Sequence, residues 1–188
     1  GVGRNRFSEP SAAEAPADTP ALPGMGRSPR TIIVSAHRPD LAVEESGAET
    51  GYLLFEVDVD TGEWTRLPFE RHPDNLIHHP RTRLLVGGAR NEDDGVRYEF
   101  LDASTAARWG AIERAFAGKA PRLISWSDDL HQVVVFTDIG ESGLYQIVDL
   151  DRGVADILAD AYPATPAAQV GLTRSIRYGA AGGLEVHG

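Results

Sequence analysis

The chain has 188 residues, 41% of them hydrophobic, and carries 28 Asp and Glu against 18 Lys and Arg, a formal net charge of −10. This size allows one core or a few sheet units, and the negative charge disfavours a nucleic-acid partner because it repels a phosphate backbone. The lack of Cys excludes disulfides, zinc–thiolate sites and a Cys nucleophile, and no apolar run reaches the roughly 18 residues of a membrane-spanning helix, so no membrane partner is expected.

Residues 1–29 are predicted to form a disordered leader or linker. They are rich in Ala, Pro, Ser, Gly and Glu, and five prolines interrupt any periodicity. Such a segment has few large apolar side chains to bury and cannot offset the entropy lost on folding.

Residues 30–173 are predicted to form an all-β domain. Short runs rich in β-branched and aromatic residues alternate with turn signals at spacings of a dozen or so residues, which is typical of strands. The runs are residues 31–34, 52–57, 83–86, 96–101, 132–136 and 144–148.

An internal repeat is the most informative feature of this domain. The motif D-x-D-x-G at residues 58–62 recurs 91 residues later at 149–153, and Asp102 closes a similar strand between them. In this motif the Gly can adopt a positive φ at a hairpin tip, and the Asp carboxylates can cap N–H groups of the turn. Three units of about 45 residues match the period of a four-stranded propeller blade. We therefore predict a partial β-propeller of about three four-stranded blades.

One helix is expected to interrupt the second unit. Ser104 can act as the N-cap of a helix over residues 105–117, in which Trp109, Ile112 and Phe116 fall on one face.

Several segments, taken in order, resemble the acylaminoacyl-peptidase-like branch of the prolyl oligopeptidase family of serine peptidases. They are YEFLD at 98–102, the helix that contains Trp109, LISWSDD at 123–129, SIRY at 175–178 and GLEVHG at 183–188, and the similarity covers roughly residues 50–188. The chain departs from the family at Gly182 or Gly183, where an Asp or Asn is frequent, and near His187, where a Pro or Ala is frequent. The resemblance implies that a propeller, usually seven-bladed, caps a C-terminal α/β-hydrolase domain. Residues 174–188 would then begin the linker into a hydrolase domain outside this chain.

This resemblance implies a non-catalytic role, in which the propeller gates the access of peptides to a serine-hydrolase site. The partners would be the hydrolase domain and the peptide substrate, and no cofactor or metal is expected. The chain itself lacks the G-x-S-x-G nucleophile elbow, since in Gly140-Glu141-Ser142-Gly143 the second Gly comes one position too early. The parent protein would be the peptidase, with its catalytic Ser, Asp and His elsewhere.

A stand-alone propeller-like module that binds a protein partner is the alternative from a different class. The segment 176–188 would have no use in such a module, whereas the peptidase requires it. An unrelated β-sandwich would leave the regular spacing of the Asp motifs without a cause. The sequence does not decide between a cytoplasmic and a periplasmic location.

Glu92, Asp93 and Asp94 are the candidate substrate-facing residues. The resemblance implies this role, because propeller residues of some relatives contact the ammonium terminus of a peptide. A β-turn that ends in Gly95 explains the same acidic run without a ligand. Both interpretations remain open at this stage.

The histidines at 72, 78 and 79 are not expected to bind a metal. Adjacent residues in a strand point to opposite sides, and no H-x-x-x-H or H-E-x-x-H spacing places two imidazoles on one face.

Overall fold

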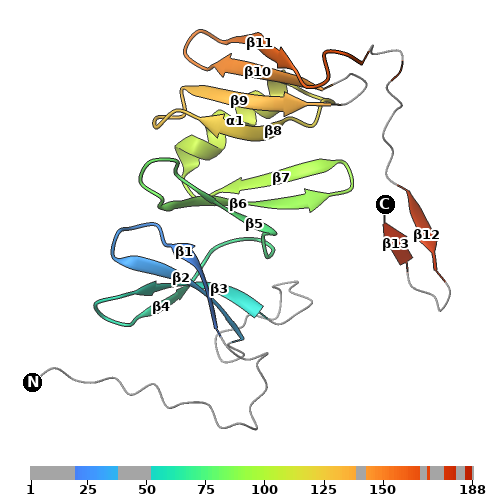
Figure 1. Cartoon of the computed structure of the whole chain (residues 1–188). Helices are drawn as coiled ribbons and strands as arrows, with labels where there is room; N and C mark the ends of the chain where they lie inside the picture. The colour runs from blue at the N-terminus through green and yellow to red at the C-terminus, as the bar shows by residue number, and fades with distance from the viewer. Residues whose placement is uncertain are drawn as a thin grey trace, which may run out of the picture. The chain divides into compact units, whose positions relative to one another are not determined.

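The computed structural model describes residues 20–37, 52–138, 143–165, 169, 176–180 and 185–187. Within these ranges the chain consists mainly of antiparallel strands with one helix, and it divides into two compact units, residues 1–72 and 73–188 (Figure 1). The described helix is too short and too polar to cross a membrane. The all-β prediction is confirmed at this level, although no sheet among the described residues closes on itself.

The first unit contains one antiparallel sheet. Its strands are β1 (Ala21–Met25), β2 (Thr31–His37), β3 (Tyr52–Asp58) and β4 (Trp64–Arg66), and they lie in chain order across the sheet. The core side chains of this unit come from both faces of the sheet, because five consecutive residues of β3 are buried.

Strand β1 corrects the prediction of a disordered leader over residues 1–29. Residues 21–25 pair with β2, whereas residues 1–19 lie outside the described residues. Pro23 fits here because β1 is an edge strand with a register shift between Ala21 and Gly24, and edges and bulges are where a strand tolerates Pro.

A buried carboxylate joins β3 to the turn between β1 and β2. Glu56 is only 7% exposed. Its oxygens accept hydrogen bonds from the main-chain N–H of Arg27 at 2.6 Å, from Nε of Arg27 at 2.7 Å and from Oγ1 of Thr31 at 2.7 Å. Burial acts to raise the pKa of Glu56, but the hydrogen bonds from Arg27 and Thr31 outweigh it and lower the pKa below its usual value.

The second unit contains three further sheets. Strands β5 (Asn75–His78), β6 (Leu85–Glu92) and β7 (Gly95–Phe100) form a three-stranded sheet, and α1 (Ala103–Ala115) follows. Strands β8 (Arg122–Trp126), β9 (Gln132–Thr137), β10 (Leu144–Asp149) and β11 (Val154–Asp160) form a four-stranded sheet, and β12 (Arg177–Gly179) pairs with β13 (Glu185–His187).

The repeated Asp has the same local role in all three sequence repeats. Asp58 Oδ1 accepts the N–H of Thr61 at 2.9 Å, and Asp149 Oδ1 accepts the N–H of Arg152 at 3.0 Å. The glycines of the two D-x-D-x-G motifs have φ of 72° and 64°, which confirms the predicted hairpin tips. In the middle sequence repeat Asp102 Oδ2 accepts the N–H of Thr105 at 2.8 Å, and a helix follows instead of a hairpin.

This exchange of a hairpin for a helix corrects two predictions. The N-cap of α1 is Asp102, not Ser104, whose hydroxyl donates to Asp102 at 2.6 Å. Hydrogen bonds from the Ser104 side chain and from Thr105 lower the pKa of Asp102 to about 2. Because the chain turns into α1 at this Asp, the middle sheet has three strands rather than the four predicted.

Both hairpin tips are also anchored in the same way. In the first unit Arg30 forms an ion pair with Asp60, and its C=O accepts the N–H of Val59 at 2.9 Å. In the second unit His131 Nδ1 lies 2.6 Å from Oδ1 of Asp151, and its C=O accepts the N–H of Leu150 at 2.9 Å. The sequence repeat is therefore matched in the structure, because Arg30, which precedes β2, and His131, which precedes β9, make equivalent contacts.

The core of the second unit lies between α1 and its neighbouring strands. The predicted apolar face of α1 is confirmed, since Trp109, Ile112 and Phe116 are all buried. They pack with Leu130, Val133, Val135 and Val148, and partly buried residues of β7 and β8 complete the cluster. The Trp109 ring meets the Tyr98 ring edge-on at 4.6 Å between centroids. Burial raises the pKa of Tyr98, although its hydrogen bond to Leu123 opposes this.

Candidate functional site

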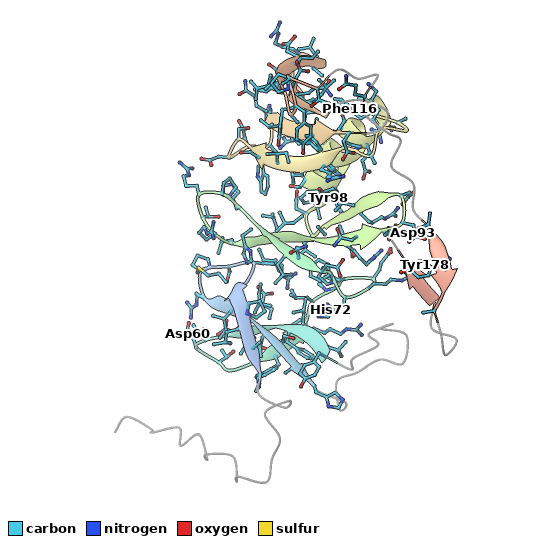
Figure 2. All side chains as sticks on the ribbon, turned by 45° about the vertical axis from the view of Figure 1, so that its right-hand side comes forward. Asp60, His72, Asp93, Tyr98, Phe116 and Tyr178 are labelled. Atoms are coloured by element: carbon cyan, nitrogen blue, oxygen red, sulfur yellow. The ribbon has the colours of Figure 1, made fainter. Side chains whose placement is uncertain are left out.

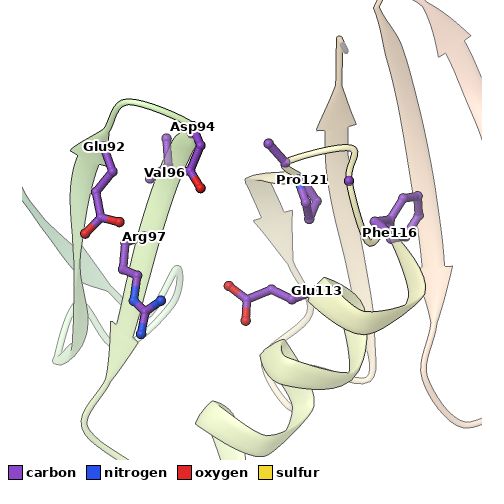
Figure 3. Close-up of a pocket in the computed structure, with 10 residues that line it drawn as sticks. Glu92, Asp94, Val96, Arg97, Glu113, Phe116 and Pro121 are labelled. Carbon is purple, nitrogen blue, oxygen red and sulfur yellow. The ribbon is translucent and has the colours of Figure 1, made fainter. Parts of the chain in front are cut away.

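A pocket of about 370 Å³ opens in the second unit between the β6–β7 hairpin and the end of α1 (Figure 3). This volume is within the range of small-molecule sites, at its small end. The lining residues are Glu92, Asp94, Gly95, Val96, Arg97, Glu113, Phe116, Gly118, Ala120 and Pro121.

One close approach and one sharp turn of the chain shape the pocket. Gly95 has φ of 146°, and a Cβ built on it would lie 3.0 Å from Cβ of Ala120. The segment after α1 also turns sharply, with φ of 78° at Gly118 and 41° at Ala120. The hairpin and the 118–121 segment therefore meet where only glycine fits at position 95.

The charged groups of the pocket are exposed, and its apolar groups lie deeper. Glu92, Asp94 and Glu113 supply three carboxylates against the one guanidinium of Arg97, and all four residues are exposed. Figure 3 shows Glu113 pointing from α1 toward the hairpin that carries the other two carboxylates. Phe116 is buried.

Two of the carboxylates have neighbours that position them. Arg90 Nη2 lies 2.7 Å from Oε1 of Glu92. The Trp109 indole donates a hydrogen bond to Oε1 of Glu113 at 2.9 Å, which connects the pocket to the core. No described cation forms an ion pair with Asp94 or Glu113. The pocket therefore keeps an excess of negative charge beside an apolar wall.

The structure separates the three acidic residues singled out in the sequence. Glu92 and Asp94 line the pocket, whereas Asp93 forms an ion pair with Arg177 of β12. Figure 2 shows Asp93 at the hairpin tip, on the side where Tyr178 of β12 lies. Contact of these residues with a substrate remains a prediction.

Sequence reasoning missed Glu113 and Arg97. Glu113 lies one helical turn after Trp109, and this spacing signals an interaction along the helix but not the pocket. Arg97 gave no signal in the sequence, because it is one charged residue in an alternating strand.

The histidine cluster is not assembled into a metal site among the described residues, where no group of three or more His, Cys, Asp or Glu is placed to hold an ion. His79 Nε2 lies 2.9 Å from the C=O of Asp128, and Asp74 accepts the N–H of Asn91 at 2.7 Å. The Gly-Glu-Ser segment at 140–142 lies outside the described residues.

The lining of the pocket supplies three carboxylates, one guanidinium and apolar side chains. A ligand with a cationic end and an adjoining apolar group matches this lining. Comparison of the chain with protein-family models, with curated proteins and with solved structures finds no match.

Proposed function

We propose that this chain is the non-catalytic β-propeller part of a serine peptidase, and that its acidic pocket holds the amino terminus of a peptide. The α/β-hydrolase domain that the peptide would reach lies outside this chain. The Asp turn that all three sequence repeats share supports the propeller fold. The segments that resemble the prolyl oligopeptidase family support the assignment to a serine peptidase. The acidic pocket is the observation that carries the binding role.

The chemistry of the lining favours an amino terminus over other ligands. An ammonium group is a compact cation with three donors, so it would form a charge-assisted hydrogen bond with the carboxylate of Asp94 or Glu113. The first side chain of the peptide would then lie against Phe116 and Val96, and Arg97 would donate to a peptide C=O. A folded protein cannot insert its backbone into a pocket of this size, which is how binding here would select short peptides.

The electrostatic attraction is modest because the carboxylates are exposed. Two unit charges about 4 Å apart gain about 1 kcal/mol in water and about 4 kcal/mol near a protein surface. Loss of one carboxylate should therefore raise the dissociation constant about fivefold to tenfold, which corresponds to about 1 to 1.4 kcal/mol.

Calorimetric titration with a matched peptide pair tests this proposal. A tripeptide with a free amino terminus should bind, and the same peptide with an acetylated amino terminus should bind at least tenfold more weakly. Asp94→Asn and Glu113→Gln should each weaken only the free peptide. Glu63→Gln, an exposed substitution in the first unit, is the matched control and should leave both affinities unchanged.

Equal binding of the free and acetylated peptides would contradict the proposal. It would leave the stand-alone interaction module as the better interpretation, since such a module needs no preference for a peptide end.

A further inference from the structure

The middle sheet leaves open an edge that a fourth strand covers in the other two sequence repeats. Strand β3 pairs with β4 in the first repeat, and β10 pairs with β11 in the third. In the middle repeat β7 is an edge strand among the described residues, because the chain turns into α1 at Asp102. An edge strand presents unpaired N–H and C=O groups that can pair with another chain.

The third repeat indicates that the main chain of Val96 points to this open edge. Val96 lies six residues before the motif Asp, and Gly143 lies at the same position in the third repeat. There the C=O of Gly143 accepts the N–H of Ala161, which follows β11, at 2.8 Å. The main-chain groups at this position are therefore the ones that face the fourth strand.

The pairing of β7 with β6 gives the same orientation independently. The N–H of Leu101, directly after β7, donates to the C=O of Val86 in β6 at 3.0 Å. In an antiparallel pair the main-chain groups of successive residues point alternately toward the partner strand and away from it. Counting back from Leu101, Arg97 faces β6 and Val96 faces away. Apart from the pairing of β7 with β6, no hydrogen bond among the described residues reaches the main chain of Val96.

The acidic pocket lies on this open edge. Gly95, Val96 and Arg97 of β7 line it on one side, and Glu113 and Phe116 line it on the side of α1 (Figure 3). The space beside Val96 is therefore bounded by the end of α1 and not by a fourth strand. An extended peptide matches this space, because the carboxylates attract its amino terminus and its own N–H and C=O groups complement those of an edge strand.

We propose that a peptide held in the acidic pocket adds to β7 as a short fourth strand, with its second residue paired to Val96. This inference rests on the proposed function, because it takes the pocket to bind a peptide amino terminus. In an extended chain the main-chain groups of successive residues point to opposite sides. When the second residue faces β7, the ammonium group of the first residue points away from β7 and toward α1, which carries Glu113. One binding mode thus satisfies both the edge of β7 and a carboxylate of the pocket.

This pairing defines the class of peptide that the site accepts. The second residue must have a free main-chain N–H, so a proline or an N-methylated residue at that place should bind poorly. The N–H of the third residue points away from β7, so its substitution should be tolerated. The side chains of the peptide matter less, since main-chain hydrogen bonds supply this selectivity.

Calorimetric titration with N-methylated peptides tests the strand addition without altering the protein. The probe is trivaline amide, and two matched peptides carry a single N-methyl group on the second or on the third residue. Methylation of the second residue should raise the dissociation constant about fivefold or more, since it removes a hydrogen bond and places a methyl group against β7. Methylation of the third residue should change it by less than about twofold. Equal dissociation constants for the two methylated peptides overturn the strand addition.

Acetylation of the same peptide separates this proposal from the proposed function. If acetylated trivaline amide binds about tenfold more weakly and the two methylated peptides bind equally, the pocket recognises the amino terminus but β7 receives no strand. If trivaline amide does not bind, or binds no better than its acetylated form, both proposals fail.

Hydrogen exchange of the protein amides gives a second measurement of the strand addition. Saturation with trivaline amide should slow exchange at the N–H of Val96 several-fold, because that group gains a hydrogen bond. Exchange at Arg97, whose N–H already faces β6, should not change. Unaltered exchange at Val96 in the saturated complex overturns the strand addition and leaves recognition of the amino terminus standing.

Discussion

Replacement of Glu56 by Gln should destabilise the first unit more than any other single change of one carboxylate to an amide in that unit. The variant removes the charge that accepts hydrogen bonds from Arg27 and Thr31 and leaves a buried amide that presents N–H groups to the N–H groups of Arg27. Breaking a buried charged network costs about 3 to 5 kcal/mol. Arg27 keeps 44% of its side chain exposed, so water replaces part of the loss and we expect about 2 to 3 kcal/mol.

The pH dependence of this contribution follows from the lowered pKa of Glu56. A carboxyl group whose folded pKa lies below its unfolded value stabilises the protein fully above the unfolded value, which is 4.5 here. The stabilisation is lost as the pH falls through the folded pKa. The difference in stability between wild type and Glu56→Gln should therefore be constant near pH 7 and shrink below pH 4.5.

Urea unfolding followed by ¹⁹F NMR of fluorotryptophan-labelled protein measures this effect. The chain has three Trp, and only Trp64 lies in the first unit, where its ring is 5.7 Å from that of Phe55. The Trp64 signal should report a lower midpoint for Glu56→Gln. The exposed Glu63→Gln should match the wild type. A Glu56→Gln variant within about 0.5 kcal/mol of Glu63→Gln, the size of a neutral surface change, would show that the hydrogen bonds of Glu56 do not stabilise the first unit.

Three further predictions concern the second unit and the turns. Ile112→Ala removes a fully buried side chain from the core around α1 and should lower the free energy of unfolding by about 2 to 5 kcal/mol in urea titrations. Gly95→Ala should both destabilise the protein and weaken peptide binding, because the residue has φ of 146° and its Cβ would lie 3.0 Å from that of Ala120. Gly62→Ala is the matched variant, since Gly62 has open space around it. It should cost only about 1 kcal/mol of stability and leave peptide binding unchanged. The cap of α1 depends on ionised Asp102, whose pKa is about 2, so helix stability should hold as the pH falls from 7 to 4 and decline toward pH 2 in circular dichroism.

Each of these three predictions would be contradicted by a different result. An Ile112→Ala variant as stable as the wild type would show that the helix is not part of the core. Equal effects of the two glycine variants on peptide binding would show that the approach of the hairpin to the 118–121 segment does not shape the pocket. A cap that fails already near pH 4 would contradict the hydrogen bonds assigned to Asp102.

Local chemistry explains why much of the fold was predictable. The two D-x-D-x-G turns depend on residues four positions apart, and the apolar face of α1 depends on residues one and two turns apart, so both were read from adjacent sequence. The N-cap was misassigned because Asp102 and Ser104 are both good capping residues, and the end of β7 decides between them. Strand β1 was missed because its pairing with β2, and not its own composition, makes it a strand.

The candidate site was predictable only in its hairpin half. Glu92 and Asp94 are adjacent to a glycine turn and were found by sequence, whereas Glu113 reaches the pocket because α1 returns alongside the hairpin. That return is a property of packing between distant elements, and no local pattern encodes it. The position of Asp93 outside the pocket lining likewise depends on its ion pair with Arg177, which lies 84 residues away in the sequence.

Mapping of peptide contacts by NMR tests most directly whether the acidic pocket binds a peptide amino terminus, since a chain of 20.3 kDa is accessible to ¹⁵N spectra. A tripeptide with a free amino terminus is titrated into the labelled chain. Binding of the amino terminus in the pocket predicts shifts at the amides of Gly95, Val96 and Gly118, which the acetylated peptide does not produce. Shifts confined to residues away from the pocket, or identical shifts with both peptides, would contradict it.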